Sequence, residues 1–79
     1  MFQCIVIVCD NGRPRLIPVQ VECSDEEREQ GDHYEAAKDY VRRAFQLPGP
    51  YVVFDEDDAW FTSFDWDQVP TIDASGATI

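Results

Sequence analysis

The stretch FQCIVIVCDNGRPRLIPVQVEC, residues 2–23, decides the fold of this chain. Residues 2–9 carry apolar side chains on both alternating faces, which is typical of a strand in the interior of a sheet. Asn11 and Gly12 follow, and both tolerate the positive φ angles of a tight hairpin turn. Residues 15–23 alternate apolar and polar side chains, and Pro18 cannot donate a ladder hydrogen bond, which favours an edge strand. The stretch therefore predicts a β-hairpin with an inner strand followed by an edge strand.

The polar stretch after the hairpin leads into one predicted helix. Capping-box spacings occur at residues 24–27 and 32–35. The second is the better helix start, because apolar side chains recur at helical spacing only after it. The run LPGP ends the pattern. We expect a helix over about 33–46, and a helical extension back to Asp25 is the alternative.

The remainder of the chain predicts a second hairpin and a tail. Residues 51–54 and 59–64 are short apolar strands across a charged turn, and residues 70–79 lack periodicity and predict a loosely held C-terminal tail. The order ββαββ gives an α+β fold in a single domain over residues 1–69, with one helix packed on a four-stranded, mostly antiparallel sheet. We expect strand order 2-1-4-3, because the doubly apolar first strand favours a place inside the sheet.

Length and charge restrict the classes of function. The chain has 79 residues, with 16 Asp and Glu against 6 Lys and Arg, and a formal net charge of -10. A domain this small buries a thin core, which disfavours a deep catalytic cleft. The negative charge disfavours direct binding to nucleic acid or to anionic membranes. A hydrophobic content of 44% is too high for a disordered acidic tail.

The residues that could carry catalysis or bind metal are few. Cys4, Cys9 and Cys23 have no paired spacing, so we expect free, buried thiols in a reducing, cytoplasmic compartment. His33 is the one histidine, and we expect it at the surface or at a helix cap. No Cys/His spacing suits zinc, and the acidic run at 55–58 has no glycine to bend a calcium loop. We therefore expect neither an enzyme nor a bound metal or cofactor.

The negative charge is unevenly distributed along the chain. Seven acidic residues and no basic residue follow Arg43, and aromatic residues are interleaved among them. Aromatic side chains ringed by charges are typical of protein interfaces. The predicted partner-binding residues are Asp55, Glu56, Asp57, Asp58, Trp60, Asp65, Trp66 and Asp67. A second candidate patch consists of Asp25, Glu26, Glu27, Glu29 and Asp32.

In size, charge and predicted architecture, the chain resembles the small acidic anti-CRISPR proteins encoded by phages. The resemblance carries no functional residue over, and Arg13, Arg15, Arg42 and Arg43 interrupt the acidic sequence. It implies a non-enzymatic, intracellular inhibitor in a bacterial host, whose acidic surface blocks the nucleic-acid-binding groove of a CRISPR effector complex. The alternative is a small structural or regulatory subunit that self-associates through its sheet. We expect a monomer or a weak homodimer.

Overall fold

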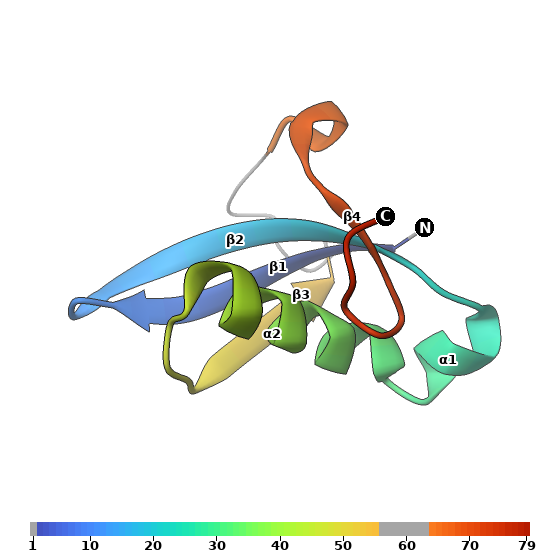
Figure 1. Ribbon diagram of the computed structural model, residues 1–79, viewed down its shortest axis with the longest axis horizontal. Helices are drawn as coiled ribbons and strands as arrows, with labels where there is room; N and C mark the ends of the chain where they lie inside the picture. Colours follow the sequence, from blue (N-terminus) through green and yellow to red (C-terminus); the bar gives the residue numbers. More distant parts are fainter. Residues whose placement is uncertain (1, 56–63) are drawn as a thin grey trace.

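A four-stranded mixed sheet with one long helix across one face forms the core of the fold (Figure 1). The computed structural model describes residues 2–55 and 64–79. The elements are β1 (Phe2–Asp10), β2 (Arg13–Glu22), α1 (Asp25–Glu29), α2 (Asp32–Phe45), β3 (Tyr51–Asp55), the short 3₁₀ helix η2 (Trp66–Gln68) and β4 (Thr71–Asp73). The predicted α+β class is confirmed.

The β1–β2 hairpin forms as the sequence predicts. The two strands pair antiparallel from Phe2↔Val21 to Asp10↔Arg13. Asn11 and Gly12 connect them with φ angles of 53° and 80°, the left-handed values that this turn requires. β1 also pairs antiparallel with β3, so it lies inside the sheet.

The strand order is β3-β1-β2-β4, which differs from the expected 2-1-4-3. The last strand is Thr71–Asp73, and it pairs parallel with Gln20–Glu22 of β2. β2 is therefore not the edge strand that the sequence predicts, because β4 covers its C-terminal end. Pro18 lies before this pairing begins. The predicted strand at 59–64 falls largely outside the described residues.

The C-terminal segment is part of the sheet, whereas the sequence predicted a loosely held tail over 70–79. Ile72 is fully buried in the main core. A turn follows it, in which Asp73 accepts hydrogen bonds from the hydroxyl and the backbone amide of Ser75. A Cβ added to Gly76 would lie 3.1 Å from the carbonyl oxygen of Ala36 in α2, so the turn packs closely on that helix. A three-residue strand shows no periodicity of its own, and tertiary contacts hold it in place.

The helical region divides at Gly31. Ser24 and Glu27 form the capping box of α1, with hydrogen bonds of 3.1 Å and 2.9 Å. Gly31 has a φ of 79° and is the N-cap of α2, which receives no side-chain capping hydrogen bond. The predicted helix over 33–46 is thus confirmed to within one residue. The preferred capping box at 32–35 is not formed, because Gly31 rather than Asp32 occupies the cap position.

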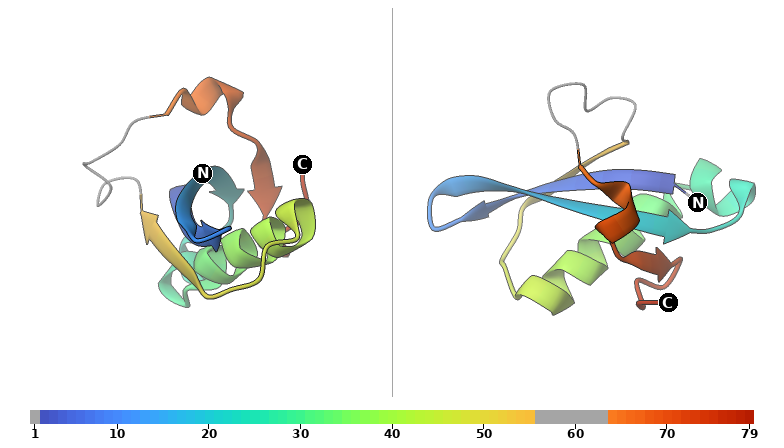
Figure 2. Two further views of the ribbon diagram at one scale, coloured as in Figure 1. Left: turned by 90° about the vertical axis from the view of Figure 1, so that its left-hand side faces the viewer. Right: turned by 90° about the horizontal axis from the view of Figure 1, so that it is seen from above.

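The main core lies between the sheet and α2. It contains buried residues of β1, β2, α2 and β4. On the opposite face, Ile5 is 1% exposed and Gln20 is 9% exposed. The Gln20 side-chain amide donates hydrogen bonds to the carbonyl oxygens of Trp66 and Val69, and η2 lies on the side of the sheet away from α2 (Figure 2). Among the described residues, no helix is both long enough and apolar enough to cross a membrane.

Candidate functional site

The predicted acidic and aromatic surface is only partly described by the structure. Glu56, Asp57, Asp58 and Trp60 lie outside the described residues. Asp65 and Asp67 are exposed at η2, and Trp66 between them is half-buried. The Trp66 ring meets the ring of Phe64 edge to face at 5.9 Å. These residues form a small patch in which two carboxylates flank one indole ring.

Asp55, the first of the predicted partner-binding residues, is engaged inside the protein. Its side chain is 24% exposed at the end of β3. One carboxylate oxygen accepts a hydrogen bond from the hydroxyl of Tyr34 at 2.9 Å. The other lies 3.5 Å from Nε2 of His33. Asp55 therefore contacts α2 instead of standing free on the surface.

The second candidate patch is centred on α1 and is strongly acidic. Residues 22–32 contain six acidic residues and one basic residue, a net charge of -5. Glu27 accepts the hydrogen bond from the backbone amide of Ser24. We name the four exposed carboxylates of this region the acidic end: Glu22, Asp25, Glu26 and Glu29. Among the described residues, none of these four takes part in an ion pair.

Three of the six basic residues lie at the other end of the molecule. Figure 1 shows the β1–β2 turn and the C-terminal end of α2 on one side, and α1 on the other. The first side carries Arg13, Arg15 and Arg42, whereas the Arg43 side chain donates a hydrogen bond to the carbonyl oxygen of Ser75 in the C-terminal turn. Arg15 and Arg42 form ion pairs with Asp10 and Asp39, at 3.3 Å and 2.7 Å. The Arg15 guanidinium also lies 4.7 Å from the ring centre of Phe45, which joins the hairpin to the helix end. The surface is therefore polarised along the long axis.

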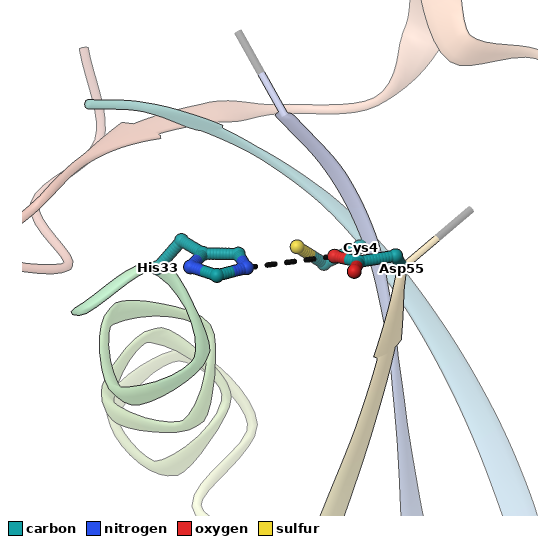
Figure 3. Close-up of side chains that lie close together, drawn as sticks. All are labelled: Cys4, His33 and Asp55. Atoms are coloured by element: carbon teal, nitrogen blue, oxygen red, sulfur yellow. Dashed lines mark ion pairs between the residues drawn. The ribbon is translucent and has the colours of Figure 1, made fainter. Parts of the chain in front are cut away.

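A second feature lies in the interior, where Cys4, His33 and Asp55 converge (Figure 3). Cys4 and Asp55 are direct partners in the β1–β3 ladder, so their side chains share one face of the sheet. His33 extends from the first turn of α2 toward that face. Their sulfur, nitrogen and oxygen atoms all lie within 4.8 Å of one another. We call this set the Cys–His–Asp cluster.

His33 is buried, which contradicts the expectation of a surface or capping histidine. It is 2% exposed, and its ring packs against Tyr34 with the ring centres 3.9 Å apart. Neither ring nitrogen makes a hydrogen bond within the described part of the chain. No sequence signal indicates this burial, because His33 follows a polar run and its partners are about 20 or more residues away.

The cluster does not favour thiol catalysis, even though its residue types match a nucleophile, a base and an orienting acid. Burial, followed by the negative charge of Asp55, raises the pKa of the Cys4 thiol to about 12. The thiolate is the reactive form of cysteine, and Cys4 is also fully enclosed. All three cysteines are free, as expected, but only Cys4 is buried: Cys9 is exposed and Cys23 is half-buried.

No family model, curated protein or solved structure matched the chain when it was compared with known proteins. Its function is therefore inferred from two features of its own residues. The acidic end is a surface feature suited to contact with a basic macromolecule. The Cys–His–Asp cluster is an interior feature suited to a small ligand.

Proposed function

We propose that this chain is a non-enzymatic inhibitor that binds a basic, nucleic-acid-binding protein through its acidic surface. The polarised charge is the observation that supports this proposal most strongly. Carboxylates can take the places of phosphates in a groove lined with Lys and Arg, and complementary potentials accelerate association. The resemblance to anti-CRISPR proteins suggests a CRISPR effector complex as the partner.

The acidic end suits this task because its carboxylates are both presented and available. The capping box fixes α1 at its first turn, so the side chains start from a defined backbone. Asp25 and Glu26 lie in that turn and are exposed. A carboxylate without an ion pair of its own can pair with an arginine of the partner at no cost in broken contacts. The patch at η2 supplies Trp66 as a candidate aromatic anchor.

The test is the association rate of the chain with a purified CRISPR effector complex at about 50 mM and about 500 mM salt. The variant Glu26→Gln/Glu29→Gln removes two charges from the acidic end. The matched control Glu35→Gln/Asp39→Asn removes two charges from α2, where both acids pair with basic residues.

We expect the acidic-end variant to associate about tenfold more slowly at the lower salt concentration, because electrostatic steering contributes a factor of that order or more. The control is expected to stay close to the unmodified rate. An association rate that does not change with salt concentration, or that falls equally in both variants, would contradict the proposal.

One observation favours the alternative, a subunit that self-associates through its sheet. β3 is the outermost described strand on its side of the sheet, and Val52 is 51% exposed on it. An exposed strand edge can pair with another chain. Sedimentation over a range of concentrations tests this candidate, with Val52→Lys as the disrupting variant. A strict monomer at the highest concentration would eliminate it.

A further inference from the structure

The Cys–His–Asp cluster offers three donor atoms of the kinds that bind zinc. Thiolate, imidazole and carboxylate are its common protein ligands, and catalytic and structural sites combine them freely. Here they come from β1, α2 and β3, elements brought together only by the fold. We propose that Cys4, His33 and Asp55 bind one divalent cation of the zinc class.

The spacing of the donor atoms fits a tetrahedral ion better than it fits a hydrogen bond. The 3.5 Å between His33 Nε2 and Asp55 Oδ1 is too long for a well-formed hydrogen bond. Zinc lies about 2.0–2.2 Å from nitrogen and oxygen ligands, so two such ligands of a tetrahedral ion are about 3.4 Å apart. Sulfur lies about 2.3 Å from the ion, which places it about 3.5 Å from the nitrogen. The donor atoms lie no more than 4.8 Å apart, so they need to approach one another by only about 1 Å to bind such an ion.

The buried histidine without a hydrogen bond is the independent observation that indicates a ligand, since its one ion-pair partner among the described residues is the Asp55 carboxylate. His33 is 2% exposed, and both of its ring nitrogens lack a hydrogen bond within the described structure. A buried polar group without a hydrogen bond is costly and uncommon in native proteins. A cation on Nε2 would satisfy the nitrogen that faces Cys4 and Asp55.

Charge balance also favours a divalent ion. A thiolate and a carboxylate together carry two negative charges, so one divalent cation makes the set neutral. A neutral set is far less costly to bury than separate charges. Binding forms a sulfur–metal bond and releases the thiol proton to solvent, and no atom is oxidised or reduced.

Tyr34 has the position of a group that orients a ligand. Its hydroxyl donates a hydrogen bond to the second Asp55 oxygen at 2.9 Å, which leaves the oxygen near His33 free for a metal. Tyr34 also lines an open groove of about 440 Å³ between α2 and β3. Asp55 is the most exposed of the three ligands. Three protein ligands leave a fourth coordination position for water.

A metal here would join β1, α2 and β3 in a domain with a small core, where bound metals commonly add stability. This inference is independent of the proposed function, since it concerns the interior and not the acidic end.

The test uses Co²⁺ as a spectroscopic substitute for zinc. The purified, reduced and metal-free chain is titrated with Co²⁺ while the absorbance is recorded. We expect a thiolate-to-cobalt charge-transfer band that saturates at one ion per chain, and Zn²⁺ added afterwards should abolish it. The midpoint of thermal unfolding should rise with Zn²⁺, because an ion that binds only the folded state stabilises it.

Two variants and one matched control make the assignment specific. Cys4→Ser should abolish the band, whereas Cys9→Ser changes an exposed cysteine of the same strand and should retain it. Tyr34→Phe keeps all three ligands and should weaken Co²⁺ binding by about 10- to 100-fold, as is usual when a ligand loses its orienting hydrogen bond. If Cys4→Ser fails to fold, the Co²⁺ affinity of Tyr34→Phe tests the metal site in its place.

Two results would overturn the site. The first is an unmodified chain that shows no thiolate-to-cobalt band at stoichiometric Co²⁺. The second is a band that survives in Cys4→Ser or in a folded Tyr34→Phe variant with undiminished affinity.

Discussion

Replacing Ile72 with alanine tests whether the C-terminal strand is part of the core. Ile72 is fully buried, and its strand pairs with residues 20–22 of β2. The substitution removes three carbon atoms, worth about 2.4 kcal/mol in transfer free energy at about 0.8 kcal/mol each. The cavity left behind adds to this, and measured costs of such substitutions are about 2–5 kcal/mol. Since β4 is short and can partly close over the gap, we expect a loss of about 2–3 kcal/mol.

The loss is large for a domain of this size, whose total stability is about 4–12 kcal/mol. It corresponds to a fall of about 10–20 °C in the thermal midpoint, measurable by circular dichroism and by denaturant unfolding. Ile79→Ala is the matched control, because Ile79 is 69% exposed and surface substitutions usually change stability by less than about 0.5 kcal/mol. If Ile72→Ala were as harmless as Ile79→Ala, residues 71–73 would not be core.

Three further predictions concern the caps and turns. Ser24→Ala should lower the free energy of unfolding by about 1 kcal/mol or less, because it removes the α1 cap; an unchanged denaturation curve would contradict the capping box. Gly76→Ala should lower the free energy of unfolding by about 1 kcal/mol more than Gly12→Ala does. Both glycines have positive φ, but only a Cβ at Gly76 would crowd α2. Equal losses of stability in the two variants would argue against that packing. Hydrogen bonds from the Ser75 hydroxyl and from backbone amides lower the pKa of Asp73. The stabilising contribution of the Asp73 carboxylate is therefore present at neutral pH and is lost as the pH falls through that lowered pKa. If NMR showed the Asp73 carboxyl titrating at or above the ordinary aspartate pKa, the prediction would be wrong.

The hairpin and α2 could be predicted because their signals are local. These signals are the apolar run of residues 2–9, the alternation over residues 15–23, the Asn11-Gly12 turn and the helical spacing after Asp32, and each acts within a few residues. The strand order could not be predicted, since β4 has only three residues and pairs across about 50 positions with β2. Its place depends on tertiary contacts, including the buried Ile72, which no local pattern records.

The same contrast between local sequence signals and tertiary contacts applies to the two candidate sites. The acidic residues of α1 could be named from the sequence, because a run of carboxylates is visible without any structure. Their separation from Arg42 and from the hairpin arginines depends on the direction of α2 along the sheet. The Cys–His–Asp cluster could not be predicted, because it requires the pairing of Cys4 with Asp55 and the placement of His33 above them. The sequence predicts Asp55 to be a surface anion for the same reason: it shows the charge of Asp55 but not its partners.

We propose that the acidic surface occupies the groove in which a partner binds nucleic acid. Competition tests it most directly: the apparent affinity of a purified CRISPR effector complex for its target DNA is measured at increasing concentrations of this chain. We expect the apparent dissociation constant for DNA to rise in proportion to the chain concentration. We also expect Glu26→Gln/Glu29→Gln to weaken this effect more than Glu35→Gln/Asp39→Asn does. An effector that binds DNA equally well at every concentration of the chain, or that binds the chain equally well when saturated with DNA, would contradict it.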